Sequence, residues 1–263
     1  MRIASWNVNS LNVRLPHVEQ WCREARPDVL ALQETKLEDA KFPNAAIEAL
    51  GYHAVFSGQK TYNGVAILAR TPPRDVVTDV PGFDDPARRV LAASVDDASL
   101  PGGELRIVDL YVVNGQSVDS EKYEYKLHWL RAVTDFLRAQ LERHPNLVVL
   151  GDFNIAPEDR DVHDPEAWRG QVLCSTPERE ALGKILQLGL RDSFRLFSDE
   201  GGHYSWWDYR QAAFRRNMGL RIDLVLVSAG LQARLKSASI DRTPRTWERP
   251  SDHAPVMIEI GNG

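Results

Sequence analysis

Short apolar runs that alternate with helical patterns constrain the fold of this chain more than any other feature of its sequence. Val29 to Leu32 and Leu147 to Leu150 are runs of four apolar residues with polar residues close by on both sides, which is typical of strands buried on both faces. The segment from Glu121 to Arg143 instead places apolar residues along one side of a long helix. A strand buried on both faces needs a covering layer on each side. The sequence therefore predicts an α/β fold with sheets inside and helices outside.

The other elements follow from the same two patterns. Turn signals at Asn63-Gly64 and Gly102-Gly103 separate neighbouring strands. No repeat, linker or low-complexity tract interrupts the chain, so we expect a single domain over residues 1–263. Further strands are predicted at residues 1–7, 52–57, 65–69, 90–95, 105–113, 222–227, 235–240 and 256–260, and further helices at 15–25, 43–50 and 177–188.

Composition excludes several classes of protein. The chain has no run of about 18 apolar residues, so no membrane span is predicted. Its N-terminal residues lack the apolar stretch of a signal peptide, and we expect a cytoplasmic protein. Cys22 and Cys174 are too few for a disulfide framework or a zinc site. The net charge of −5 does not indicate nucleic-acid binding by itself, but it leaves room for a local basic face.

Polar side chains repeatedly stand at the ends of the predicted strands. In layered α/β folds, ligands collect at strand ends along one rim of a sheet. Carboxylates, carboxamides and a histidine on one rim would form an oxygen-rich pocket that suits Mg²⁺ or Mn²⁺ better than Zn²⁺. The residues in question are Asn7, Gln33, Glu34, Tyr111, Asn114, Asp152, Asn154, Asp223, Asp252 and His253.

Each of these residues also has an ordinary structural explanation. Asn7 could cap the segment that follows it, and Glu34 could be a loop acid. Asp152 and Asn154 could form a turn by bonding their own backbone, as could the segment from Ser251 to Pro255. These explanations weaken together because every residue falls independently at the end of a strand. The combined pattern favours a metal-assisted site.

Seven segments also resemble the motifs of one known family, in the same order along the chain. They are Ser5-Trp6-Asn7-Val8-Asn9-Ser10-Leu11, Leu32-Gln33-Glu34-Thr35-Lys36, Gly51-Tyr52, Tyr62-Asn63-Gly64-Val65-Ala66-Ile67-Leu68, Gly151-Asp152-Phe153-Asn154-Ile155, Gly219-Leu220-Arg221-Ile222-Asp223-Leu224 and Pro250-Ser251-Asp252-His253-Ala254-Pro255-Val256. The family they resemble is the exonuclease III-type apurinic/apyrimidinic (AP) endonucleases of the endonuclease/exonuclease/phosphatase superfamily, and the resemblance runs from residue 1 to about residue 260. It implies a four-layer αββα sandwich with two facing mixed β-sheets.

The resemblance implies a role for each strand-end residue. Asp152 would activate water or protonate the leaving group, and Asp223 would orient His253, which donates to the scissile phosphate. The sequence leaves open which group is the base and which the acid. The implied catalytic set is Tyr111, Asp152, Asn154, Asp223 and His253, and the implied metal set is Asn7, Glu34, Asp152, Asn154, Asp252 and His253.

Two positions depart from the family pattern. Asn9 stands where some members carry an aspartate that helps to hold the metal, and a neutral amide is a weaker Mg²⁺ ligand. We therefore leave Asn9 outside the metal set. Val113 stands where a proline is common.

DNA contact is expected from residues around the same rim. The segment Ser205-Trp206-Trp207-Asp208-Tyr209-Arg210 resembles one that packs near the abasic nucleotide, with one of its tryptophans expected in the core. The predicted DNA-binding set is Arg88, Asn114, Trp206, Arg210 and His253, with Arg89, Lys122, Lys126, Arg215, Arg216 and Arg249 as further phosphate-contact candidates. The polar loop at residues 156–170 is expected to be ordered near the site.

The expected function is Mg²⁺-dependent hydrolysis of the phosphodiester 5′ to abasic sites in duplex DNA, with Mn²⁺ as a substitute metal. The resemblance also implies 3′→5′ exonuclease and 3′-end-cleaning activities, and a monomeric enzyme. Two alternatives remain, a superfamily phosphoesterase acting on inositol phosphates or sphingomyelin, and a DNA-binding protein without catalysis. The full-length motif match opposes the first, and the intact set of Glu34, Asp152, Asn154, Asp223 and His253 opposes the second.

Overall fold

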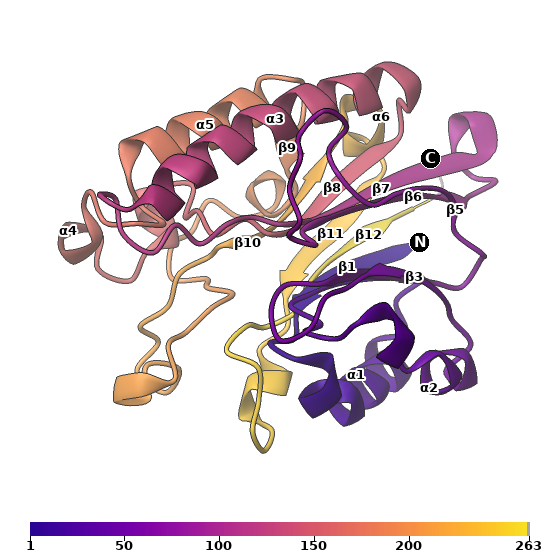
Figure 1. Ribbon diagram of the computed structural model, residues 1–263, viewed down its shortest axis with the longest axis horizontal. Coiled ribbons are helices and arrows are strands. Elements are labelled where there is room, and N and C mark those ends of the chain that lie inside the picture. Colours follow the sequence, from indigo (N-terminus) through magenta and orange to yellow (C-terminus); the bar gives the residue numbers. More distant parts are fainter. Residues whose placement is uncertain (262–263) are drawn as a thin grey trace.

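Two six-stranded mixed sheets lie face to face in the computed structural model, which describes residues 1–261 (Figure 1). The first sheet has the order β11-β12-β1-β2-β4-β3 and the second β5-β6-β7-β8-β10-β9. In each sheet one central pair is parallel, β1 with β2 and β7 with β8. The strands are β1 (Arg2–Asn7), β2 (Val29–Gln33), β3 (His53–Ser57), β4 (Val65–Ala69), β5 (Arg74–Val77), β6 (Val90–Asp96), β7 (Glu104–Tyr111), β8 (Leu147–Asp152), β9 (Arg191–Asp192), β10 (Asp223–Val227), β11 (Leu235–Ile240) and β12 (Val256–Ile260).

Helices cover the outer face of each sheet. In Figure 1, α3 and α5 lie over the second sheet, and α1 and α2 lie against the first. Short 3-10 turns and the helices α4 and α6 complete the connections. The helices are α1 (Leu11–Ala25), α2 (Asn44–Ala49), α3 (Glu121–Arg143), α4 (Pro165–Trp168), α5 (Thr176–Leu186) and α6 (Ala229–Gln232). None of the helices in residues 1–261 is long and apolar enough to span a bilayer.

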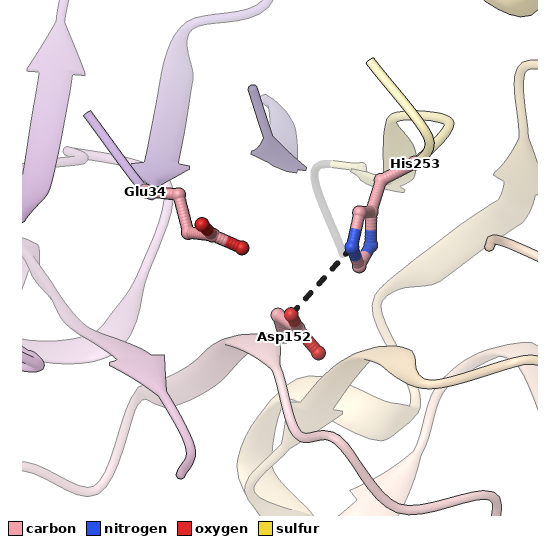
Figure 2. Close-up of side chains that lie close together, drawn as sticks. All are labelled: Glu34, Asp152 and His253. Atoms are coloured by element: carbon pink, nitrogen blue, oxygen red, sulfur yellow. Dashed lines mark ion pairs between the residues drawn. The ribbon is translucent and has the colours of Figure 1, made fainter. Parts of the chain in front are cut away.

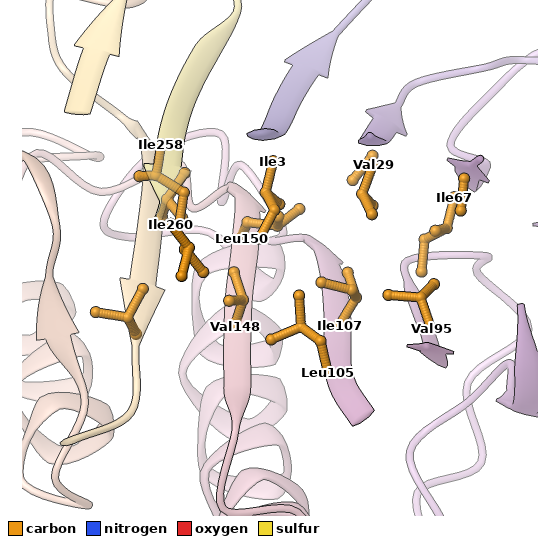
Figure 3. Close-up of a cluster of buried hydrophobic side chains, with 14 of the residues drawn as sticks. Ile3, Val29, Ile67, Val95, Leu105, Ile107, Val148, Leu150, Ile258 and Ile260 are labelled. Carbon is orange, nitrogen blue, oxygen red and sulfur yellow. The ribbon is translucent and has the colours of Figure 1, made fainter. Parts of the chain in front are cut away.

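Three apolar layers hold this arrangement together. Between the sheets, side chains such as Ile3 and Val29 of the first sheet face Val148 and Leu150 of the second (Figure 3). A second cluster joins the outer face of the second sheet to α3, where Leu130 is fully buried. A third cluster, which includes Trp6 and Trp21, joins the first sheet to its own helices. The four-layer αββα sandwich is therefore confirmed.

Local sequence accounts for where the two helices on the second sheet begin. Ser120 caps α3, because its Oγ accepts from the backbone N–H of Tyr123 at 3.1 Å. Ser175 and Glu178 form a reciprocal capping box at the start of α5, and Pro177 stands in its first turn. Both caps lie near the rim that carries the polar strand-end residues.

Several predicted boundaries were wrong by a few residues, and two strands were not predicted. The strand predicted at residues 105–113 ends at Tyr111, and the helix predicted at residues 177–188 ends at Leu186. The missing strands are β5 and β9, which lie at opposite edges of the second sheet. β9 has two polar residues, and most of β5 is exposed. Their positions follow from backbone pairing with β6 and β10, and an apolar pattern does not mark them.

The topology brings the predicted site residues to one rim. Asn7 pairs with Gln33 at the ends of the parallel strands β1 and β2, so Glu34 follows directly. Tyr111 pairs with Asp152 at the ends of β7 and β8, and Asp152 pairs in turn with Asp223 at the start of β10. The two sheets present these ends on the same side of the sandwich, as β1 contacts both β8 and β10.

Candidate active site

A pocket of about 310 Å³ opens at this rim. Asn7 and Asp223 lie just behind the pocket wall, where both are buried. Eleven of the predicted strand-end and DNA-contact residues thus lie at one place, either in the wall or directly behind it. The pocket is lined by Glu34, Tyr111, Asn114, Asp152, Asn154, Trp168, Leu173, Trp206, Asp208, Arg210, Ile222, Asp252 and His253.

Glu34, Asp152 and His253 form the centre of the site. Each offers a ligand atom, and these atoms all lie within 4.8 Å of one another. They come from three different elements, the loop after β2, the end of β8 and the loop before β12, and their side chains point toward a common space (Figure 2). Two carboxylates this close together repel each other unless positive charge is near them. The geometry therefore suits a cation.

Asn7 links the carboxylates of Glu34 and Asp152 by hydrogen bonds. Its Nδ2 donates to Glu34 Oε1 at 2.9 Å and to Asp152 Oδ2 at 2.9 Å. Its Oδ1 accepts from the backbone N–H of Asn9 at 2.9 Å. In this arrangement Asn7 donates to one oxygen of each carboxylate, and its own side-chain oxygen is occupied by the backbone.

Asp152 is buried and carries a strongly perturbed charge. Burial raises the pKa of Asp152 to about 7, and the negative charges of Asp223 and Glu34 also raise it, while His253 and the hydrogen bond from Asn7 lower it. At neutral pH this carboxyl group can therefore give up or accept a proton within the site. Few positions in a folded protein give a carboxyl group this property at physiological pH.

Asn154 follows Asp152 in a left-handed backbone conformation, with φ of 49°. Its backbone N–H donates to Asp152 Oδ1 at 2.9 Å, and its Nδ2 donates to Asp152 Oδ2 at 3.2 Å and to the carbonyl of Val112 at 3.0 Å. Asn114 donates to its Oδ1 at 3.1 Å. The amide of Asn154 therefore reaches a phosphoryl oxygen only by giving up one of these bonds.

His253 is oriented by Asp223. The Nδ1 atom of His253 lies 2.9 Å from Asp223 Oδ2, and its Nε2 lies 3.7 Å from Asp152 Oδ2. Burial by itself lowers the pKa of His253, but the charges of Asp223 and Asp152 outweigh it and raise this pKa to about 10. The imidazole is thus protonated at neutral pH. A protonated imidazole has no free lone pair, so in this state His253 acts as a hydrogen-bond donor.

Glu34 stands at a strained position beside a lysine. Its backbone φ is 52°, and its Oε2 lies 2.9 Å from Lys36 Nζ. Lys36 Nζ also donates to Asn9 Oδ1 at 2.6 Å. The neutral Asn9 therefore faces an ammonium group, and a positive charge already lies at the edge of the carboxylate cluster.

Asp252 connects the site to the aromatic loop. Its Oδ1 accepts from Asn9 Nδ2 at 2.9 Å, and its Oδ2 accepts from Trp206 Nε1 at 3.0 Å. Trp206 lines the pocket, whereas Trp207 is fully buried against Phe214. The expectation that one of the two tryptophans packs in the core is confirmed.

The predicted DNA contacts differ in how available they are. The side chain of Arg210 is 85% exposed, although it pairs with Asp208, and Asn114 is exposed at the pocket edge. Arg88 pairs with Asp79 outside the pocket lining. Arg89 lies closer to the site, with its guanidinium carbon 4.8 Å from the centre of the Tyr111 ring.

One phosphate-contact candidate is contradicted by the structure. Lys126 is fully buried, and its ammonium group is bonded within the protein, so it cannot reach a phosphate. It stands on the inner side of α3, a position that its charge alone could not reveal. The other candidates on this list, Lys122, Arg215, Arg216 and Arg249, are exposed.

Sequence reasoning missed Trp168, Leu173 and Asp208, which line the pocket. Trp168 ends α4 inside the polar loop that was expected near the site. Leu173 is buried with φ of 74°, an unusual conformation for a branched residue. Asp208 belongs to the aromatic segment that the resemblance had singled out, but no role was assigned to it.

The residues present fit a divalent metal. Glu34 and Asp152 offer hard oxygen ligands from both sheets, and Asn7 holds their positions. Burial raises the pKa of Asp152, and a cation bound beside this carboxyl group would stabilise its charged form.

The chain is similar over almost its whole length to known proteins. Residues 4–253 match the Endonuclease/Exonuclease/phosphatase family. The chain is 34% identical to exodeoxyribonuclease III of Haemophilus influenzae, over 99% of this chain and 100% of that protein. It is 50% identical to the 3′ phosphatase NExo from Neisseria bound to a product DNA hairpin, with a TM-score of 0.95 over 99% of both chains. An AP endonuclease from Archaeoglobus fulgidus is 38% identical, with a TM-score of 0.92 over 99% of both chains.

Proposed function

The chain belongs to the endonuclease/exonuclease/phosphatase family and is a DNA repair nuclease of the exonuclease III type, and we propose that it hydrolyses phosphoesters at abasic sites and at 3′ ends of duplex DNA with Mg²⁺ as its metal. The observation that carries this proposal is the close grouping of the partly buried Glu34 with the buried Asp152 and His253, with Asp223 behind the histidine. We further propose that the enzyme acts as a cytoplasmic monomer.

Three side chains of the pocket can act directly on a phosphate group. His253 is held protonated by Asp223 and faces the pocket, so it can donate to a phosphoryl oxygen as negative charge develops there. Burial and the charges of Glu34 and Asp152 raise the pKa of Tyr111, so its hydroxyl stays neutral and can donate as well. Asp152 can accept the proton of an attacking water or return one to the leaving oxygen.

A divalent cation held by Glu34 and Asp152 would supply positive charge to the phosphoryl oxygens and the leaving group. The protein residues determine where that charge would lie. Asn7 joins the two carboxylates, and Lys36 limits the freedom of Glu34. Oxygen ligands favour Mg²⁺ or Mn²⁺ over softer metals.

The pocket supports both proposed substrates. Trp206, Leu173 and Ile222 give it an apolar side, which suits a deoxyribose without a base, or a terminal sugar. The Archaeoglobus relative is described as an AP endonuclease and the Neisseria relative as a 3′ phosphatase. The higher identity to the Neisseria protein favours processing of 3′ ends as the stronger of the two activities.

Two labelled duplexes test the proposal, one with an internal tetrahydrofuran abasic analogue and one with a 3′-phosphate at a nick. We expect incision or phosphate release with Mg²⁺ and none with EDTA. Binding without reaction on either duplex would favour a non-catalytic protein. Turnover of inositol phosphates or sphingomyelin in place of DNA would favour the other phosphoesterase alternative.

A variant tests the role assigned to His253. His253→Ala should lower turnover by about a hundredfold or more, which is the scale for losing one charge-stabilising donor. Circular dichroism and thermal unfolding should show an intact fold. Near-normal turnover in this variant would contradict the donor role.

A further inference from the structure

Lys126 and Glu178 form a fully buried ion pair beneath the wall of the active-site pocket. Both side chains have no exposed surface, and Lys126 Nζ contacts Glu178 Oε1. The lysine comes from α3 and the glutamate from the first turn of α5. Removing two charges from water is costly, and such a pair adds little stability over apolar side chains of similar size. Because the ion pair adds little stability, its role has to be sought in the groups that it contacts.

The ammonium group of Lys126 binds two loops by their backbones. Its Nζ donates to the carbonyl of Asn154 at 2.7 Å and to the carbonyl of Asn114 at 3.1 Å. Together with Glu178, these acceptors use all three of its N–H groups. The loop after β7 and the loop after β8 are thereby both bound to the ammonium group of Lys126.

Glu178 binds a third segment with the same carboxylate. Its Oε1 accepts from the backbone N–H of Leu173 at 3.0 Å, and its Oε2 accepts from the backbone N–H of Ser175 at 3.1 Å. The conformation of Leu173, with φ of 74°, is therefore held in part by this bond. The segment at 173–175 is joined to the loop after β8 by this ion pair and by the backbone bond from Ala156 N–H to the carbonyl of Leu173, at 2.8 Å.

Each of the three segments gives one residue to the pocket wall, namely Asn114, Asn154 and Leu173. Asn114 donates to Asn154, and Asn154 donates twice to Asp152, from its side chain and from its backbone. A shift of the Asn154 backbone therefore moves the Asp152 carboxylate directly.

We infer that Lys126 and Glu178 are positioning residues, which fix Asn154 and through it Asp152 in the geometry that the reaction requires. Neither residue touches the substrate, so both act through the three backbone segments. The inference rests on the proposed function, because that function places Asp152 at the reacting phosphate group. A displacement of about 1 Å at a reacting group can slow a reaction about a hundredfold, so loss of the ion pair can lower the cleavage rate strongly.

The test compares Lys126→Met with a matched control, Arg106→Met. Arg106 is also a buried cation bound to α3, but it lies at the opposite end of that helix, where it contacts Gln140, Ser94 and the carbonyl of Asp75. Both variants lose a buried positive charge. Only Lys126→Met should disturb the pocket wall.

The measurements are single-turnover cleavage of the abasic duplex with enzyme in excess, the dissociation constant for the same duplex, and thermal unfolding. At a temperature where both variants are folded, Lys126→Met should cleave roughly ten to a hundred times more slowly than wild type. Its affinity for DNA should change less than about threefold. Arg106→Met should cleave at the wild-type rate. This difference between rate and affinity would not arise from general destabilisation.

Two outcomes overturn the inference. One is a folded Lys126→Met protein that cleaves within about twofold of wild type, and the other is an equal loss of rate in Arg106→Met. If Lys126→Met does not fold, Glu178→Gln is measured instead, because glutamine keeps the shape of the side chain and one of its two acceptor oxygens. A slower cleavage rate in Glu178→Gln supports the inference, and an unchanged rate overturns it. A wild-type protein that cleaves neither duplex contradicts the proposed function instead, which separates the two failures.

Discussion

At the scale of single residues, the site depends on how the protein distributes a small number of charges. Asp152, Asp223 and Glu34 bring three carboxylates close together, and His253 and Lys36 are the cations that face them. Asn7 and Asn154 add neutral donors to the same oxygens. Each of these groups therefore sets the protonation or the position of a neighbour.

The pair of His253 and Asp223 predicts a specific pH dependence. Burial lowers the pKa of His253, and the charge of Asp223 is the first of the effects that raise it to about 10. The histidine donor is thus lost only as the pH rises through about 10. In Asp223→Asn the pKa of His253 should fall, so the alkaline loss of activity should begin at a lower pH. Turnover measured from about pH 6 to about pH 11 checks this, because that range includes the wild-type loss near pH 10.

The contrary result for this pair is also clear. If Asp223→Asn loses activity at the same alkaline pH as wild type, a group other than His253 causes the alkaline loss of activity. His253→Ala serves as the control, since its residual activity should show no limb assignable to the histidine.

Lys36 predicts a change in metal affinity. Its ammonium group lies 2.9 Å from Glu34 Oε2 and competes with a cation for that carboxylate. Lys36→Met should therefore lower the Mg²⁺ concentration that gives half-maximal activity, by several-fold. A Mg²⁺ titration of cleavage checks this, with Lys184→Met as a control at an exposed lysine on α5. A higher Mg²⁺ requirement in Lys36→Met would show that Lys36 supports the metal site.

At the scale of elements, the position of the site depends on how closely the parallel strands β7 and β8 approach each other near their ends. Gly151 in β8 has φ of 142°, and a Cβ there would lie 1.9 Å from the carbonyl oxygen of Leu110 on β7. Only glycine permits this close approach of the two parallel strands. The next residue, Asp152, is thereby placed at the rim.

Gly151→Ala should consequently destabilise the protein by at least about 2 kcal/mol, because backbone atoms must move to admit the methyl group. Gly183→Ala is the matched control. Gly183 lies in α5 with open space around the added Cβ, and alanine there should stabilise by about 0.5–1 kcal/mol. Urea unfolding of both variants measures the difference. Equal stabilities would mean that β7 and β8 can separate without cost.

The elements also show how far the sequence could predict this structure. β2 and β8 were predicted because they are apolar on both faces, and their polar ends gave Glu34 and Asp152. β9 was not predicted, because two polar residues at a sheet edge form no apolar pattern. The role of Lys126 could not be predicted either. Its partner lies 52 residues away, and only the packing of α3 against α5 brings them together.

At the scale of the whole molecule, the site lies across the boundary between the two sheets. Glu34 follows a strand of the first sheet, and Asp152 ends a strand of the second. The interface between the sheets is otherwise apolar over most of its area. At the rim, the two sheets therefore face each other with charged side chains. Behind the rim, they contact each other through apolar side chains.

A metal that binds both carboxylates should stabilise the folded protein as a whole. Ligand at about a hundred times its dissociation constant adds about 2.7 kcal/mol, because it binds the folded state only. For a chain of this size, that corresponds to a rise in melting temperature of roughly 5–10 °C. Saturating Mg²⁺ should produce this rise in wild type, and EDTA should reverse it. In Glu34→Gln the rise should largely disappear, while NaCl at equal ionic strength should have little effect on either protein. If Glu34→Gln and wild type gain equally from Mg²⁺, the metal binds elsewhere and does not join the two sheets.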